Sequence, residues 1–265
     1  MTEIKVDPAE IEFFQQNGYI QYHDFLSKGQ IELLRQALDL AVSTRRDRIR
    51  GAEKGGRLSE EYERVFNQMV NLWTDYPQAR DIAFDPRLGE YARQLSLCRH
   101  VRIYHDHAMI KPPGQVSKQT NWHQDAPYWP MDPVGALSAW IAVDDVTIEN
   151  GCLHFVPGSH SHGPLDPISL ESDDDSVVER LRTRGIAVPG PVAMPMRAGG
   201  VTFHHGCTFH YAGPNRSDRP RRAFAIIYIP DYTRFTGGKD AAGAAEEMKI
   251  GGPWNHAIHP IVAGH

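Results

Sequence analysis

Long apolar runs are missing from this chain of 265 residues. A transmembrane helix needs about 18 or more consecutive apolar residues, and no such stretch occurs. The first residues (1–5) contain no apolar core of the kind that a secretory signal requires. We therefore expect no membrane partner and a cytoplasmic location.

Cysteine is also scarce, and basic residues do not outnumber acidic ones. The three cysteines, Cys98, Cys152 and Cys207, stand far apart and show none of the paired spacings of a structural zinc site. A reduced chain without disulfides is the simplest interpretation, and it agrees with a cytoplasmic location. A formal net charge of −5 argues against nucleic acid as a partner. The sequence leaves open whether the chain is a monomer or a homodimer.

What the sequence does contain is a helical first part followed by strand patterns. Asp7-Pro8-Ala9-Glu10 is typical of a capped helix start, and residues 19–22 form a short strand candidate. Further helices are expected after Ser27, around 60–73 and after Asp85. Strand patterns follow at 101–111, 136–144, 152–157, 201–205 and 223–229.

Helices first and antiparallel strands afterwards predict an α+β fold, with a β-sandwich or jelly-roll core that carries helices on one sheet. We expect a single domain over 1–265, mainly helical to 98, with the core at 99–230 and a C-terminal tail at 231–265. The polar, acidic connection at 163–196 interrupts this core, and long connections of this kind often act as lids.

The chemistry is concentrated at His123-Gln124-Asp125. On an extended strand, His123 and Asp125 point to the same face, because strand side chains alternate. His210 is the candidate for a third ligand. Two imidazoles and one carboxylate leave open positions on iron(II) for an oxoacid and O₂, whereas a closed four-ligand zinc site has none. A lone His-x-Asp pair is a weak signal, since such residues are often exposed polar groups.

The motifs around this pair occur together in a consistent order along the chain. They are Trp122-His123-Gln124-Asp125, Trp140, Glu149-Asn150-Gly151-Cys152-Leu153, Val156-Pro157-Gly158-Ser159-His160, His210-x-x-Gly213-x-Asn215 and Arg221. This set resembles the phytanoyl-CoA dioxygenase family of iron(II)/2-oxoglutarate-dependent oxygenases. The resemblance implies a double-stranded β-helix (a jelly roll) with iron at one open end. It implies His123, Asp125 and His210 as iron ligands, with 2-oxoglutarate and O₂ as co-substrates.

The resemblance also implies that Arg221 binds the far carboxylate of 2-oxoglutarate. A guanidinium fork matches a carboxylate with two hydrogen bonds, and Arg221 would begin a strand. Arg219 and Arg222 are rivals, although Arg222 has the opposite strand parity and Arg219 precedes a proline. The alternative interpretation of all three arginines is a solvated basic turn.

Further candidates lie on the strand at 101–111, one face of which carries Ile103, His105, His107, Met109 and Lys111. From the resemblance, His107, Met109 and Trp140 are expected beside 2-oxoglutarate. Candidates for the substrate pocket are His105, Tyr128, Trp129 and Tyr211. Core packing explains the aromatic residues about as well, and His204 and His205 are interpreted as structural histidines. At Ala212, some family members carry a serine that bonds the oxoacid, and this chain lacks that hydroxyl.

The resemblance implies oxidation of an unactivated C–H bond in a small-molecule substrate, with succinate and CO₂ as co-products. Halogenating relatives lack the carboxylate ligand, so Asp125 favours hydroxylation or another oxidation over halogenation. Two alternatives stay open at this point: a non-catalytic metal-binding or ligand-binding module on the same fold, and a site that uses another metal and no oxoacid.

Overall fold

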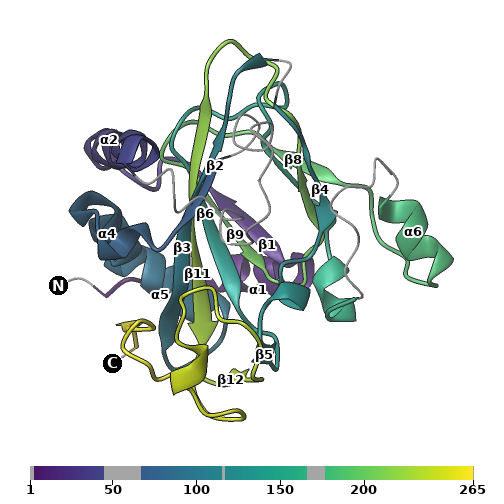
Figure 1. The fold of residues 1–265 in the computed structure, drawn as a ribbon. Helices are drawn as coiled ribbons and strands as arrows, with labels where there is room; N and C mark the ends of the chain where they lie inside the picture. The colour runs from purple at the N-terminus through teal and green to yellow at the C-terminus, as the bar shows by residue number, and fades with distance from the viewer. Residues whose placement is uncertain (1–2, 45–66, 115–116, 166–176, 265) are drawn as a thin grey trace.

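Two antiparallel sheets pack face to face in the computed structural model, which describes residues 3–44, 67–114, 117–165 and 177–264 (Figure 1). Helices cover the outer face of the larger sheet, and the smaller sheet lies on its other side. This arrangement is a jelly roll with added helices, which confirms the expected α+β class.

The larger sheet has the strand order β1-β9-β6-β11-β3-β13, and β2 also pairs with β3. Its strands are β1 (Tyr19–Tyr22), β2 (Asn67–Val70), β3 (Val101–Lys111), β6 (Leu137–Ala142), β9 (Val201–His205), β11 (Arg221–Pro230) and β13 (Ile261–Ala263). The expectation of a helix at 60–73 is wrong at residues 67–70, which form β2, while a short 3-10 helix, η3 (Leu72–Thr74), covers its last two residues. Here β2 pairs with β3, and Met69 lies opposite Ala108 in the apolar core.

The smaller sheet has the order β4-β10-β7-β8, and a separate two-stranded sheet joins β12 to β5. These strands are β4 (Thr120–His123), β7 (Leu153–Phe155), β8 (Val192–Met194), β10 (His210–Ala212), β5 (Met131–Asp132) and β12 (Arg234–Phe235). Apolar side chains from both sheets, including Trp140, Phe155 and Ala225, fill the space between them. This inter-sheet space also contains the predicted site.

Helices α1 (Pro8–Asn17), α2 (Lys28–Thr44), α4 (Pro77–Ala83) and α5 (Pro86–Leu95) bury one face each against the larger sheet. The α1 cap is as predicted, because Asp7 accepts from the Ala9 amide at 2.8 Å and Glu10 completes a capping box. Leu34 and Leu38 on α2 are fully buried, and each such side chain contributes about 1.5–3 kcal/mol. None of the described helices combines the length and apolarity needed to cross a membrane.

The described part of the 163–196 connection contains helix α6 (Val177–Thr183), on the outer side of the smaller sheet, and strand β8, which pairs with β7 in that sheet. Helix α6 packs on the sheet through Val177 and Leu181, against Trp122 and Phe209 (Figure 1). Residues 166–176 lie outside the described part of the chain. A lid therefore stays a prediction, since α6 itself covers the back of the strands that carry His123 and His210.

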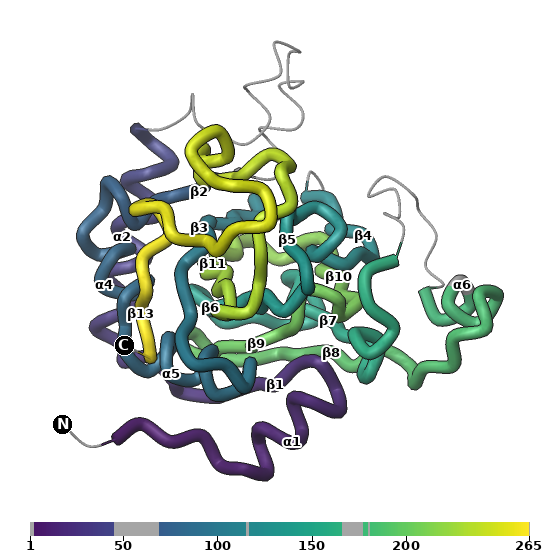
Figure 2. The backbone as a smooth tube through the Cα atoms, turned by 90° about the horizontal axis from the view of Figure 1, so that it is seen from below, coloured from purple at the N-terminus to yellow at the C-terminus, as the bar shows by residue number. Residues whose placement is uncertain are grey.

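The C-terminal segment closes one end of the larger sheet (Figure 2). Phe235, Met248 and Trp254 pack with Tyr104 and Ile227 in a separate apolar cluster. A buried pair locks the segment in place. The Nε2 atom of His259 lies 3.2 Å from Asp240 Oδ2, and its Nδ1 lies 3.1 Å from the carbonyl oxygens of residues 103 and 104.

Candidate active site

The donor atoms of His123, Asp125 and His210 converge between the two sheets. One ligand atom from each lies within 4.8 Å of the others. Asp125 Oδ1 is 3.5 Å from His123 Nε2 and 3.8 Å from His210 Nε2. His123 and His210 are directly paired residues of β4 and β10, so strand pairing alone brings the two imidazoles together.

Asp125 does not lie on the strand with His123, as predicted, but in the turn that follows it. Strand β4 ends at His123, and Asp125 has helical dihedral angles (φ −76°, ψ −37°) before the short helix η5 (Ala126–Tyr128). The side-chain amide of Gln124 fixes this turn, since it donates to Cys207 O at 2.7 Å and to Gly163 O at 2.9 Å. The convergence therefore depends on an anchored turn, and strand alternation does not account for it.

Backbone carbonyls set the orientation of both imidazoles. His123 Nδ1 lies 2.7 Å from Asn121 O, and His210 Nδ1 lies 3.0 Å from Thr208 O. A carbonyl oxygen only accepts, so we assign the proton to Nδ1 in each ring. The Nε2 lone pairs are then left to point at the cluster, which is the arrangement of metal-ligating histidines.

The charge states of the cluster also suit a metal. Burial alone would raise the pKa of Asp125, but His210, His123 and His204 outweigh it and hold that pKa well below its usual range. Burial, together with the neighbouring His123, lowers the pKa of His210 to about 3. A carboxylate and neutral imidazoles are the protonation states that bind a divalent cation.

Two further side chains hold the other oxygen of the carboxylate. Ser138 Oγ donates to Asp125 Oδ2 at 3.3 Å, and His204 Nε2 lies 3.6 Å from the same atom. Ser138 and His204 are paired residues of β6 and β9, and His204 is only 2% exposed. His204, interpreted from the sequence as a structural histidine, thus lies beside the cluster. Only cross-strand register could have revealed this.

Arg221 lies at the other end of the inter-sheet space. It is 2% exposed, and its guanidinium carbon lies 5.5 Å from the centre of the Trp140 ring. Its Nε and Nη1 atoms have no hydrogen-bond partner. Burial lowers its pKa to about 10, so Arg221 stays charged at neutral pH. A buried cation with unused donors is incomplete without an anion.

The two other candidate arginines, Arg219 and Arg222, do not point into the inter-sheet space. Arg222 points to the opposite face, where it pairs with Asp39 at 2.7 Å and Asp144 at 3.1 Å. The Arg219 side chain is exposed. Of the three arginines, only Arg221 therefore has donors available to a ligand in the inter-sheet space.

Strand β3 supplies one wall of this space. Met109 and His107 pair in register with Ala223 and Ala225 of β11, and Ala225 in turn pairs with Trp140. The His105 and His107 rings are 5.3 Å apart. Their shared face is as predicted for the residues from His105 onward.

Ile103 does not share that face, which corrects the expectation. The β3–β11 register shifts at Tyr104, since Ile227 pairs with His105 while Tyr228 pairs with Ile103. Ile103 therefore packs into the core under the helices, and Tyr104 turns toward the C-terminal segment. An extra residue of this kind is a β-bulge, which reverses the parity of everything before it.

The aromatic pocket candidates separate into two groups. Tyr128 is 45% exposed, and burial and the charge of Asp125 raise its pKa, so it lies near the cluster. Trp129 is half-buried and edge-on to Tyr104. Tyr211 instead stacks on Trp122 at 5.3 Å and belongs to the cluster beneath α6. The structure thus places Tyr211 on the face opposite His210, which corrects its assignment to the pocket.

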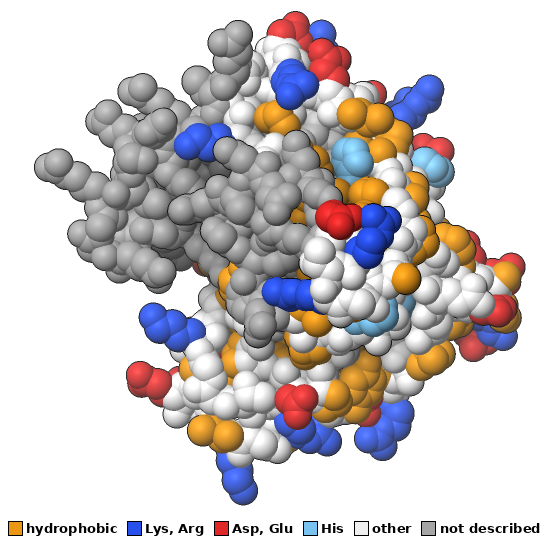
Figure 3. All heavy atoms as spheres, turned by 90° about the vertical axis from the view of Figure 1, so that its right-hand side faces the viewer, with side chains coloured by type: hydrophobic (Ala, Val, Ile, Leu, Met, Phe, Trp, Pro, Cys, Tyr) orange, Lys and Arg blue, Asp and Glu red, His pale blue; other side chains and the backbone are white. Residues whose placement is uncertain are grey.

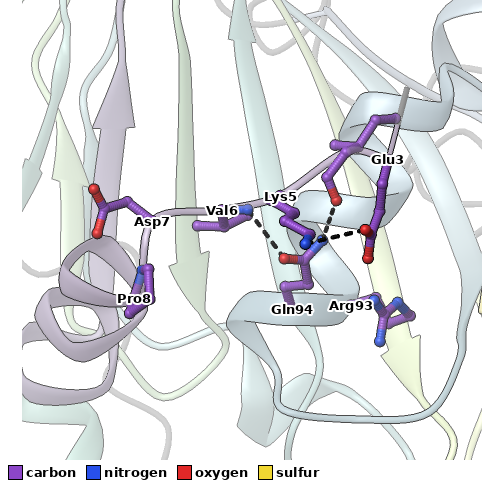
Figure 4. A pocket seen from close by; sticks show the side chains of 8 residues that line it. Glu3, Lys5, Val6, Asp7, Pro8, Arg93 and Gln94 are labelled. Atoms are coloured by element: carbon purple, nitrogen blue, oxygen red, sulfur yellow. Dashed lines mark hydrogen bonds and ion pairs between the residues drawn. The ribbon is translucent and has the colours of Figure 1, made fainter.

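A surface pocket elsewhere does not compete with this site. It lies between the N-terminal segment and α5, and Gln94 bonds both Val6 N and Ile4 O there (Figure 4). Helix α5 packs on the outer face of the larger sheet, so the sheet separates this pocket from the cluster. The face drawn in Figure 3 intersperses basic and acidic side chains, without a broad basic patch among those described.

Comparison with known proteins agrees with this geometry. The family model described as Phytanoyl-CoA dioxygenase (PhyH) matches residues 14–223. The phytanoyl-CoA dioxygenase domain-containing protein 1 of Mus musculus is 33% identical over 159 residues, which cover 57% of this chain and 52% of the mouse protein. This chain therefore matches about half the length of that relative.

Two solved structures resemble the whole chain. The non-heme alpha-ketoglutarate-dependent carbocyclase SnoK from nogalamycin biosynthesis is 26% identical, with a TM-score of 0.79 and coverage of 98% of this chain and 97% of SnoK. The epimerase SnoN, in complex with Fe³⁺, alpha-ketoglutarate and nogalamycin RO, is 25% identical, with a TM-score of 0.72 and coverage of 97% and 100%. Since the family model spans most of the sequence, this chain belongs to the phytanoyl-CoA dioxygenase family.

Proposed function

We propose that this chain is an iron(II)- and 2-oxoglutarate-dependent dioxygenase that oxidises an unactivated C–H bond of a small molecule, with succinate and CO₂ as co-products. One observation carries the proposal. The inter-sheet space has a converging His-Asp-His set at one end and, at the other, a buried arginine whose Nε and Nη1 atoms have no partner.

Iron(II) fits the residues present. His123 Nε2, His210 Nε2 and Asp125 Oδ1 are nitrogen and oxygen donors, and the two imidazoles are oriented by carbonyls. Bound iron supplies oxidation by O₂, which no side chain can perform. The similar epimerase SnoN was crystallised with Fe³⁺ and alpha-ketoglutarate, which supports the same pair of ligands here.

The side-chain donors beyond the metal ligands suit 2-oxoglutarate. Arg221 would bind the far carboxylate through its unused Nε and Nη1 donors. Trp140 lies against that guanidinium, while His107 and Met109 line the adjoining strand. The oxoacid would span the space from Arg221 to the metal ligands, so one small molecule would bind at both ends.

The substrate would enter beside the metal ligands. His105, Trp129 and the exposed Tyr128 are the candidates for this wall, and they come from β3 and from the turn after Asp125. These residues would orient the reacting C–H bond and exclude water. Tyr211 is left out because its ring faces α6.

Hydroxylation is the reaction we infer first, because Asp125 occupies the position that is vacant in halogenating relatives. The similar proteins SnoK and SnoN are named a carbocyclase and an epimerase. Product analysis therefore has to separate a hydroxylated product from a ring-closed or epimerised one.

The test is reconstitution of the purified chain with iron(II), ascorbate and 2-oxoglutarate, followed by measurement of succinate in the presence of candidate substrate pools. We expect succinate that requires both iron and O₂ and that disappears in His123→Ala. Binding of metal and 2-oxoglutarate without succinate from any pool would instead indicate a non-catalytic ligand-binding module. Binding of metal without any binding of 2-oxoglutarate would indicate a metal site that uses no oxoacid.

A further inference from the structure

Lys111 and Arg221 face each other directly across two hydrogen-bonded strands. They are paired residues of β3 and β11, so both side chains leave the same face of the sheet, with Cβ atoms about 5 Å apart. Lys111 is 0% exposed and Arg221 is 2% exposed. Like charges in directly opposite positions destabilise a sheet, and burial increases that cost. The pair therefore needs a compensating anion.

Three backbone carbonyls fix the charge of Lys111. Its Nζ donates to Lys118 O at 3.0 Å, to Ala212 O at 2.9 Å and to Gly213 O at 2.6 Å. Carbonyl oxygens only accept, and only the ammonium form has an N–H bond for each of them. Burial and the charge of Arg221 lower the pKa of Lys111, which favours the neutral amine. The three short contacts outweigh that tendency, and we assign the charged form.

No protein anion balances this pair among the described residues. Asp144 raises the pKa of Arg221, yet its carboxylate is bonded to Arg35 and Arg222. Burial raises the pKa of the Cys152 thiol, so it carries no charge at neutral pH. The two cations differ in one respect: Arg221 keeps unused donors, whereas all the donors of Lys111 are engaged.

We propose that Lys111 is a specificity-determining residue whose charge, without direct contact, makes the site prefer 2-oxoacids that carry a distal carboxylate. Arg221 binds that carboxylate, and Lys111 adds a second positive charge to the same end of the space. A 2-oxoacid without a distal carboxylate leaves both cations unpaired and gains nothing from them. This inference rests on the proposed use of 2-oxoglutarate.

The same contacts suggest a competing role as a clamp. The carbonyls that Lys111 binds belong to residues just before β4 and at the end of β10, the strands that carry His123 and His210. Loss of a clamp would disturb the metal ligands, so it would weaken the metal and every 2-oxoacid together. Loss of a charge would weaken only ligands with a distal carboxylate.

The experiment uses Lys111→Met and Lys111→Gln in the full chain. Lys111→Gln removes the charge but keeps an amide donor for the carbonyls, which guards against loss of folding. Cobalt(II) is titrated first. 2-Oxoglutarate and 2-oxobutanoate, which share a chelating head and differ in the distal carboxylate, are then titrated into the metal-loaded protein by calorimetry.

We expect affinity for 2-oxoglutarate to fall about ten- to a hundredfold in both variants, with the cobalt and 2-oxobutanoate affinities unchanged. Equal losses for both oxoacids, or a loss of cobalt affinity, would show a clamp and overturn the inference. An unchanged preference would also overturn it. A wild-type chain that binds neither oxoacid would reject the proposed function itself, which is a different result.

Discussion

The two ends of the inter-sheet space balance their charges in opposite ways. At the metal end (His123, Asp125, His204 and His210), one carboxylate lies among three imidazoles and accepts from Ser138. At the cation end (Lys111 and Arg221), no carboxylate of the described residues bonds either side chain. At the first end the protein supplies the anion itself, whereas at the second end the balancing anion has to come from a ligand.

The largest effect is expected at the metal end. Asp125→Ala removes its only anion and leaves neutral imidazoles, so affinity for cobalt(II) or iron(II) should fall by more than about a hundredfold. Metal titration of the purified variant measures this. Ser138→Ala keeps all three ligands and should lose far less. Comparable losses in the two variants would mean that Asp125 is not a ligand.

At the cation end, we expect Arg221→Met to stabilise the ligand-free chain and to weaken the binding of 2-oxoglutarate. Removing an unpaired buried cation should raise the free energy of unfolding of the ligand-free chain by about 1–2 kcal/mol. Affinity for 2-oxoglutarate should fall about a hundredfold or more. Thermal unfolding with and without metal and 2-oxoglutarate measures both effects.

Arg222→Met is the matched control for this prediction. Its side chain pairs with Asp39 and Asp144 on the opposite face, so 2-oxoglutarate affinity should stay unchanged while stability falls. If Arg221→Met lowers stability in the same way, the description of the cation end as uncompensated is wrong.

A smaller effect is expected from His204→Phe, which keeps an aromatic ring against Phe155 but removes the nitrogen that approaches Asp125 Oδ2. Residues that support a metal ligand typically contribute about ten- to a hundredfold to affinity. Metal titration should show a loss in that range, and His204→Gln should recover part of it. If the phenylalanine variant binds metal normally, His204 only fills space.

The smallest effect concerns the pair that locks the C-terminal segment. Burial would raise the pKa of Asp240, but His259 and the amides of Ala242 and Ala244 outweigh it and lower that pKa. A lowered pKa stabilises the fold above the ordinary value of about 4, and that contribution is lost as the pH falls through the folded value. Asp240→Asn should therefore show a shallower loss of stability between about pH 5 and pH 3, measured by denaturant unfolding.

Strand alternation made much of the site predictable from sequence. The strand pattern predicts the bounds of β3, and alternation places His107, Met109 and Lys111 on one face, which the resemblance directs to the pocket; Arg221 is separated from Arg222 by the same alternation. Alternation failed where the backbone departs from a regular strand. The bulge at Tyr104 moves Ile103 to the other face, and Asp125 lies in a turn that the Gln124 side chain holds.

Other roles could not be predicted because they depend on neighbours that are distant in sequence. Lys111 gains its place opposite Arg221 from a pairing between residues 110 positions apart (221 − 111). His204 lies beside Asp125 only because β9 pairs with β6. Tyr211 is a different case, because it directly follows His210 on β10 and alternation alone places its side chain on the opposite face, beneath α6.

The outer edge of β3 has a practical consequence. Two short strands cover it: β2 pairs with His107–Ile110 and β13 pairs with Val101 and Arg102. A long uncovered edge strand invites pairing between molecules and hence aggregation. An affinity tag joined directly after β13 would strain the pairing of β13 with β3. For expression, a tag at the opposite terminus, or one separated by a flexible spacer, is therefore the better choice.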